Sequence, residues 1–389
     1  MMGRRVSRQP EAGRPVLVNI LEGGMMLRYY FLPIFIIFSI SVFALNKGET
    51  RKTVTISRVI QVSLFLLVVT LVVSTISMLV GSSQIGTFSA LKRLLSGLYK
   101  GDTGLLPTEK AILFSIRLPR IIFAGIVGAS LSAAGVVFQG LLRNPLADPY
   151  ILGISGGSAV GAIIAIIIGI SVIPLGIPGM AFSGALLTIV LVYGIARTKK
   201  EIQSTTLLLA GVIVNAFFMA LIMFLIFTTS DKNLHSIMFW MMGDLSLAEW
   251  NEILLTGLFL TGGFIVIYIY ARHLNLIVTG EETAMQLGVN VERTKKVLLL
   301  AASLITGVVV SVSGIIGFVG LIIPHMMRIV LGSDHRLLLP SSLIFGGSFL
   351  IVADTIARTI IAPAELPVGV ITAMCGAPYF IYLLRRRAA

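Results

Sequence analysis

The chain has 389 residues, of which 56% are hydrophobic and only 12% are charged, whereas soluble domains carry about 25% charged residues. With a mean hydropathy of +0.99, this composition excludes an ordinary soluble domain and indicates an integral membrane protein. The 30 Lys and Arg against 17 Asp and Glu give a net charge of +13. In so apolar a chain, we interpret that excess as loops facing an anionic cytoplasmic leaflet, not as nucleic-acid binding.

The first predicted element is an apolar run at residues 29–45, inside an N-terminal extension that covers residues 1–56. Its C-terminal flank carries Lys47, Arg51 and Lys52, which places that flank inside the cell. We predict an extra transmembrane helix here. A signal-like segment and a misplaced translation start are the alternatives.

The remaining chain, residues 57–389, is predicted to form one all-α integral membrane domain, a polytopic bundle of about ten core transmembrane helices. A spanning helix needs about 20 apolar residues. Segments of suitable composition cover residues 57–80, 119–142, 153–175, 180–196, 205–228, 251–271, 297–317, 319–332, 338–361 and 367–384. The segment 319–332 is short and follows a glycine-rich join at Gly317–Gly320, so the seventh and eighth segments are expected to meet at a broken junction.

The positions of Lys and Arg predict the orientation of this bundle, because cytoplasmic loops are enriched in both. The loops that we assign to the cytoplasm contain Arg197, Lys199, Lys200, Arg272, Arg293, Lys295, Lys296, Arg328, Arg336, Arg385, Arg386 and Arg387. The C-terminus is therefore predicted to be cytoplasmic, in a multi-pass protein of the cell membrane. Residues 81–120 fall on the external side yet are also basic, and this exception requires a reason.

Two segments of the chain are weakly similar in sequence. AAGVVFQGLLRNPL (133–146) and VSGIIGFVGLIIPH (312–325) share small, branched and proline residues at equal offsets, but they start on opposite sides of the membrane. Inverted repeats are typical of transporters, although two short matches in a chain of this composition also arise by chance.

Several longer strings, in register over residues 57–388, carry a family resemblance. They are RLPR (117–120), FQGLLRNPLADPYILGISGGSAVGA (138–162), FWMMGDLS (239–246), GEETAMQLGV (280–289), GFVGLIIPHMMR (317–328), DHRLLLP (334–340) and AELPVGVITAMCGAPYFIYLL (364–384). The chain resembles the FecCD-type permease family of ABC importers for iron-siderophores, haem and cobalamin. This resemblance implies a homodimer or a pair of homologous permease subunits, two cytoplasmic ATPase subunits and an external substrate-binding protein.

The cytoplasmic loop at residues 275–295 is the predicted ATPase-coupling loop. Acidic residues in the first turn and a glycine at each end of GEETAMQLGV predict a short helix pair, with Ala284 and Leu287 forming an apolar face. The resemblance implies that this loop docks into a groove on the ATPase, and the alternative is an amphipathic loop resting on its own bundle. The candidate coupling residues are Gly280, Glu281, Glu282, Ala284, Leu287, Gly288 and Val289.

The chain contains no G-x-x-x-x-G-K-[ST] phosphate loop, the sequence that cradles nucleotide phosphates in many ATPases. We therefore expect no enzyme activity and no cofactor on this chain. ATP and Mg are expected on the partner ATPase.

Three arginines on the predicted external side, Arg117, Arg120 and Arg358, are candidates for docking the binding protein. Guanidinium groups suit bidentate pairing with carboxylates, and the resemblance implies that arginines at these positions grip glutamates of that protein. Snorkelling to lipid phosphate is one alternative. The other is an internal ion pair, because Asp354 lies four residues before Arg358.

The predicted spans carry few charged residues and many small ones, a composition that permits close helix packing. A passage with such a lining suits a bulky chelate better than a bare ion. The resemblance places the translocation gate at Leu146, Ser204 and Thr205, although Leu146 also fits ordinary packing. The four histidines have no ligand spacing, so no metal site is predicted on the chain.

These observations together predict the permease subunit of an ATP-driven importer of an iron(III)-siderophore complex. Cobalamin and haem permeases share the same motifs, and siderophore is preferred only because it is the commonest substrate of the family. An ion-coupled secondary transporter usually has ionisable groups near the bilayer midplane, and an intramembrane enzyme needs a catalytic cluster at membrane depth. The sequence offers few residues for either. The expected partners are the ATPase, the binding protein, a second permease subunit and membrane lipid.

Overall fold

The computed structural model describes residues 54–81, 106–170, 173, 175–198, 201–202, 204–246 and 249–388. The predicted extra span at residues 29–45 and most of the basic loop 81–120 lie outside the described residues.

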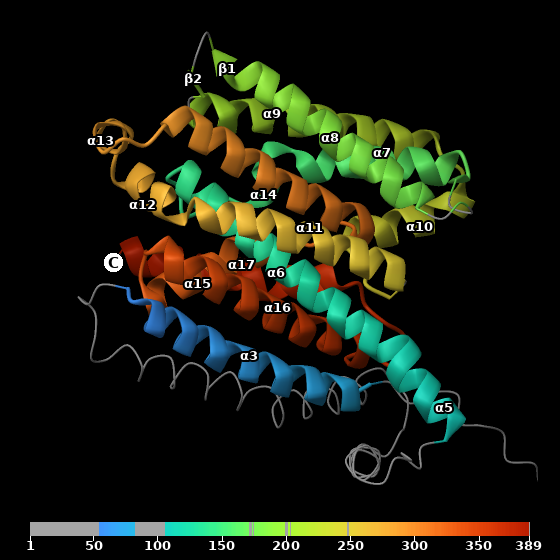
Figure 1. The fold of residues 1–389 in the computed structure, drawn as a ribbon. Coiled ribbons are helices and arrows are strands. Elements are labelled where there is room, and N and C mark those ends of the chain that lie inside the picture. Colours follow the sequence, from blue (N-terminus) through green and yellow to red (C-terminus); the bar gives the residue numbers. More distant parts are fainter. Residues whose placement is uncertain are drawn as a thin grey trace, which may run out of the picture.

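The described chain is a bundle of helices with one very small hairpin (Figure 1). The hairpin pairs β1 (Arg197–Thr198) with β2 (Glu201–Ile202) in antiparallel orientation. The helices are α3 (Ile56–Leu79), α5 (Pro107–Lys110), the π-helix η2 (Ala111–Arg117), α6 (Leu118–Leu141), the 3-10 helix η3 (Pro149–Leu152), α7 (Ile154–Ile167), α8 (Gly176–Ala196), α9 (Ser204–Thr228), α10 (Asp231–Met242), α11 (Trp250–Ile269), α12 (Ala271–Thr279), α13 (Glu281–Gln286), α14 (Val291–Ser313), α15 (Val319–Leu331), α16 (His335–Thr359) and α17 (Val368–Ala388).

Ten apolar helical segments correspond to the ten predicted spans. Within the described residues, seven helices are long and apolar enough to cross a membrane, and three shorter apolar helices accompany them. The all-α membrane bundle is therefore confirmed. The prediction of a helix over 153–175 was too long, because α7 ends at Ile167 and Gly169 follows with a φ of +75°, a conformation that only glycine adopts readily.

The predicted break between the seventh and eighth segments is also present. Helix α14 ends at Ser313 and α15 begins at Val319, so residues 314–318 are not helical. The Tyr150 hydroxyl donates to the Ile316 carbonyl at 2.9 Å and accepts from the Ile316 N–H at 3.1 Å. One side chain thus satisfies both backbone groups of Ile316, as backbone inside a membrane bundle requires.

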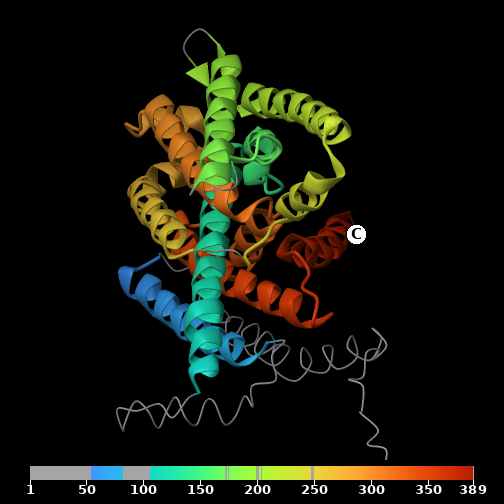
Figure 2. The same cartoon turned by 90° about the vertical axis from the view of Figure 1, so that its right-hand side faces the viewer.

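Helix α6 runs through the middle of the bundle (Figure 2) and is buried over most of its length. A Cβ atom on Gly128 would lie 2.2 Å from the Gly346 carbonyl oxygen of α16, and one on Gly135 would lie 1.9 Å from the Gly320 oxygen of α15. Backbone-to-backbone packing of this kind is available only to very small residues. The Gly135 contact also joins the two segments that echo each other in sequence.

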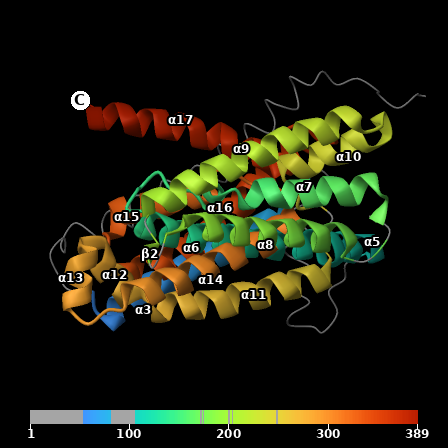
Figure 3. The same ribbon diagram turned by 90° about the horizontal axis from the view of Figure 1, so that it is seen from above.

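The two ends of the bundle differ in what they carry. Helix α13 and the C-terminal end of α17 lie at one end, which we call the α13 end, whereas α5 and α10 lie at the other (Figures 1 and 3). Between the ends, α9 and α11 expose large apolar side chains such as Leu209, Phe224 and Leu258. Such faces suit contact with lipid or with another membrane subunit.

Replacing Gly128 with Ala should lower the thermal midpoint of the detergent-solubilised protein, because the added methyl group forces α6 away from α16. The matched control is Gly262→Ala in α11, where nothing lies within 4 Å of the new Cβ. That change should leave the midpoint equal or slightly higher, since Ala favours a helix by up to about 1 kcal/mol over Gly. Equal midpoints for both variants would contradict the close-packing argument.

Candidate functional site

The predicted coupling loop folds into two short helices, α12 and α13, separated by Gly280. Glu281 and Glu282 occupy the first turn of α13, where negative charge is favourable. The predicted helix pair is therefore present, and α13 projects from the end of the bundle in Figure 1.

The two apolar residues assigned to one face of α13 point in different directions. Ala284 is completely buried and forms a small core with Ile277, Val289 and Val291, whereas Leu287 is 62% exposed. The predicted shared face was wrong, because α13 ends at Gln286 and Leu287 is its C-cap. The inner residues attach the pair to the protein, and Leu287 remains available at the surface.

Two basic residues hold the α12 and α13 pair in place. Lys295 of α14 places its Nζ atom 2.6 Å from the Glu281 carboxylate, and Arg143 donates to the Ile277 carbonyl at 2.6 Å. Arg143 also lies 3.8 Å from Glu281. Sequence reasoning missed both roles. The only signal for Arg143 was its place in the string FQGLLRNPL. No signal pointed to Lys295, because it lies 14 residues from Glu281 and no local spacing links the two.

The candidate docking arginines form a buried cluster at the other end of α6 and α16. Arg120 pairs with Asp354 at 2.9 Å and with Glu365 at 2.6 Å. Arg358 lies 3.2 Å from the same Asp354 carboxylate and donates to the Ser77 hydroxyl at 2.9 Å. The proposed internal pair between Asp354 and Arg358 is therefore present.

Arg117 belongs to the same region and binds α3. Its guanidinium donates to the Met78 carbonyl at 2.9 Å and to the Leu79 carbonyl at 3.3 Å. Arg117, Arg120 and Arg358 are 4%, 7% and 4% exposed, so in the single chain they join α3, α6 and α16. Their role in docking a binding protein stays a prediction.

The three candidate gate residues lie in two segments. Leu146 is 41% exposed in the loop between α6 and η3, and its N–H is bound by the Asn144 side chain at 2.9 Å. Ser204 and Thr205 begin α9, and Thr205 is exposed. Helix η3 approaches α9 closely, because a Cβ atom on Gly211 would lie 2.4 Å from the Ile151 carbonyl oxygen. The gate assignment itself stays a prediction.

Asp148, in the same loop, caps η3. Its carboxylate accepts from the Tyr150 N–H at 2.9 Å. Sequence reasoning did not identify Asp148 or Tyr150 as functional, although both lie in the string NPLADPYILG. Together they fix the loop that carries Leu146 against the broken junction at Ile316.

Comparison with known proteins agrees with this architecture. Residues 66–386 match the FecCD transport family. The chain is 46% identical over 284 residues to the cobalamin import system permease protein BtuC of Halobacterium salinarum, covering 73% of this chain and 76% of that one. It is 38% identical over 328 residues to the hemin transport system permease protein HmuU of Yersinia pestis, covering 82% and 94% of the two chains.

A solved structure supports the same conclusion. An inward-facing metal-chelate type ABC transporter shares 31% identity with this chain at a TM-score of 0.71, covering 84% of this chain and 99% of that one. The fold and these similarities define a multi-pass membrane permease subunit of an ABC importer. The chain belongs to the FecCD transport family.

Replacing Arg120 with Leu should lower the thermal midpoint in detergent substantially. Removing one partner of a buried ion pair costs about 3–5 kcal/mol, and Asp354 would keep only Arg358. Glu365→Gln provides the control, because that side chain is 39% exposed and the amide oxygen still accepts from Arg120. A midpoint that Arg120→Leu leaves unchanged would show that the cluster does not stabilise the fold.

Replacing Leu287 with Arg should abolish ATP-dependent uptake while the purified protein keeps its thermal midpoint, because the side chain is exposed and its loss leaves no cavity. Leu287→Met is the matched control and should retain uptake, since it preserves an apolar side chain of similar size. The measurement is uptake into proteoliposomes that contain the chain with its ATPase. Normal uptake by Leu287→Arg would refute the assignment of α13 as the coupling element.

Proposed function

We propose that this permease moves an iron(III)-siderophore complex from an external binding protein into the cytoplasm, using ATP that partner subunits hydrolyse. The observation that supports this most directly is the similarity to the metal-chelate type ABC transporter, which extends over 84% of the chain.

The exposed α13 is the proposed contact with the ATPase. It is small, anchored by Glu281 and Lys295, and presents Leu287 outward. The basic residues of this end support a cytoplasmic location for α13 and for the C-terminus. ATP and Mg then bind to the partner ATPase, whose movement repositions α13. A second permease subunit, identical or homologous, completes the passage.

The arginine cluster is the proposed docking region for the binding protein. Arg120 and Arg358 are already engaged by Asp354, whereas Glu365 is the more exposed partner of Arg120. A carboxylate of a docking protein would therefore compete with Glu365 for one face of the Arg120 guanidinium. Such an exchange would weaken as salt concentration rises.

Cobalamin is the second candidate substrate. The observation that favours it is the 46% identity to a relative named as a cobalamin import permease. Other relatives are named for hemin and for iron chelatin. All of these cargoes are bulky chelates.

Proteoliposomes that contain this chain, its cognate ATPase and the binding protein should accumulate a ⁵⁵Fe-labelled siderophore complex only when ATP is supplied. The same vesicles are tested with labelled cobalamin and with hemin, and a proton ionophore is added in a parallel series. Preferential uptake of cobalamin would replace the proposed substrate with the second candidate. Uptake that the ionophore abolishes, or accumulation by this chain alone, would contradict the ATP-driven mechanism.

A further inference from the structure

The string DHRLLLP begins at the turn between α15 and α16, and its first residues have no role in the function proposed above. Asp334 is the N-cap of α16, and its carboxylate accepts from the Arg336 N–H at 3.0 Å. The Arg336 guanidinium pairs with the same carboxylate at 2.6 Å. These contacts hold the pKa of Asp334 down at about 2, so the carboxylate stays charged at neutral pH.

Asn275 of α12 reaches this turn and uses both ends of its side-chain amide there. Its Nδ2 atom donates to the Asp334 carboxylate at 2.9 Å, and its Oδ1 atom accepts from the His335 N–H at 2.9 Å. The His335 Nδ1 atom lies 2.6 Å from the same oxygen. Because a backbone N–H can only donate, the orientation of the amide is fixed, and His335 must carry its proton on Nδ1.

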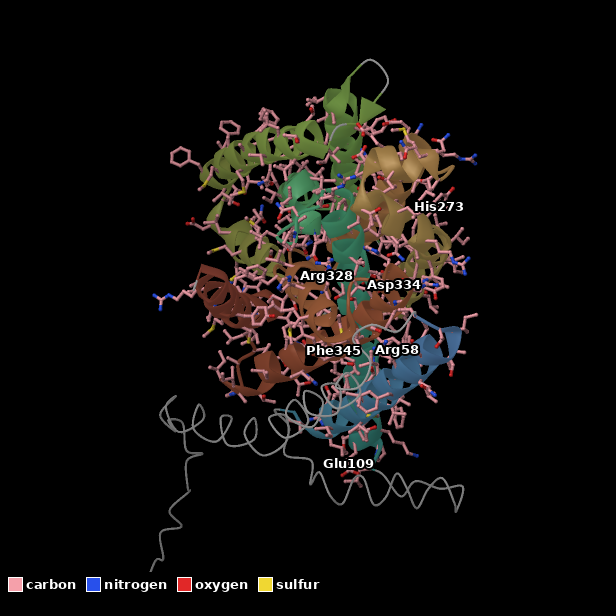
Figure 4. The ribbon with its side chains drawn as sticks, turned by 90° about the vertical axis from the view of Figure 1, so that its left-hand side faces the viewer. Arg58, Glu109, His273, Arg328, Asp334 and Phe345 are labelled. Atoms are coloured by element: carbon pink, nitrogen blue, oxygen red, sulfur yellow. The ribbon has the colours of Figure 1, made fainter. Side chains whose placement is uncertain are left out.

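We call the contacts of Asn275 with Asp334 and His335 the joint; it lies where α12 meets the rest of the bundle. Figure 4, viewed from the α13 end, shows Asp334 beside α12, the helix that carries the labelled His273. His335 is only 3% exposed. Next to Asn275 along α12, Leu274 is completely buried, and a Cβ on Gly140 of α6 would lie 3.0 Å from it. The hydrogen bonds of the Asn275 side-chain amide therefore form at a site that is shielded from water on the side facing α6.

The partner of the joint, α16, extends to the other end of the molecule. Its 25 residues correspond to about 37 Å at 1.5 Å per residue, which is enough to cross the apolar layer of a membrane. Near its far end, Asp354 binds Arg120 and Arg358. One helix thus connects the turn that Asn275 holds with the buried arginine cluster.

We infer that Asn275 is a positioning residue that joins the coupling helices α12 and α13 to α16, so that a displacement of α13 is passed to α16. The inference rests on the proposed function, since the displacement comes from the ATPase. Apolar contacts are non-directional, so they specify the relative position of two helices less sharply than hydrogen bonds do. The amide of Asn275 has three directional hydrogen bonds to two consecutive residues, Asp334 and His335, and these resist sliding.

A second contact to the same turn provides a matched control. The Tyr268 hydroxyl of α11 lies 3.3 Å from the Arg336 carbonyl oxygen, and Tyr268 is 39% exposed. Tyr268→Phe removes this longer, more exposed hydrogen bond from the neighbouring helix and leaves the Asn275 amide intact. It should change coupling less than twofold.

The test uses proteoliposomes of the complete importer, in which ATP hydrolysis and uptake of the labelled chelate are measured on the same vesicles. Asn275→Leu keeps the number and branching of the side-chain heavy atoms but cannot form the hydrogen bonds, and we expect the number of chelate molecules taken up per ATP to fall at least tenfold. The amount of ATPase that co-purifies should stay equal to that of the wild type. Asn275→Asp should show the same loss, because it places a second carboxylate against Asp334.

Combining Asn275→Asp with Asp334→Asn should restore uptake per ATP to within threefold of the wild type. Asn is as good an N-cap as Asp, and its amide can donate to the new carboxylate at position 275. If uptake per ATP recovers in this double variant, its loss in Asn275→Asp came from the specific contact and not from general damage to the fold, because both substitutions are still present.

Normal uptake per ATP in Asn275→Leu or Asn275→Asp would overturn the inference. If the single variants fail to assemble with the ATPase, the double variant decides. If the double variant assembles with the ATPase and its uptake per ATP is restored, the joint is supported. If it assembles but uptake per ATP stays low, or if it fails to assemble, Asn275 has a purely structural role and the inference is overturned. A wild-type complex without ATP-dependent uptake of any of the three chelates would instead contradict the proposed function itself.

Discussion

The close backbone contact of α6 with α16 and α15 is the constraint on which the rest of the structure depends. Lipid tails are as apolar as leucine, so no hydrophobic force drives helices together within a membrane, and association relies on packing and polar contacts. Glycines at positions 128, 135 and 346 allow these backbones to touch. Because α6 and α16 are fixed against each other, the polar groups at both of their ends are held in defined positions.

Polar groups are buried where neighbouring helices need a fixed relative position. Burying a charge is costly, and a buried ion pair is weak evidence of stabilisation by itself. The Arg120 and Asp354 pair joins α6 to α16, and the Asn275 and Asp334 contact joins α12 to α16. The Lys295 and Glu281 pair joins α14 to α13. Each contact adds directional bonds to the packing between two elements and thereby helps to specify their register.

Hydropathy and glycine punctuation were enough to predict the ten apolar segments, the short helix pair and the break before α15, because each depends on nearby residues. The end of α7 and the direction of Leu287 were missed, since they depend on the backbone at single positions. The Asp354 and Arg358 pair was among the alternatives, because the two residues lie four positions apart, whereas the polar contacts between distant residues were missed for a different reason. Arg120 and Glu365 are 245 residues apart, and Asn275 and Asp334 are 59 apart, so only the folded chain brings them together.

The position of α13 bears on the two interpretations of its loop. An amphipathic loop that rests on its own bundle should bury its larger apolar side chains and expose its smaller ones. The opposite is seen here, because Ala284 and Val289 are buried whereas Met285 and Leu287 are 56% and 62% exposed. Met285 and Leu287 thus present apolar side chains at the surface beside the charged residues Glu281 and Glu282. The packing of α13 therefore differs from that expected of an amphipathic loop resting on its own bundle, and the role of α13 as a coupling element stays a prediction.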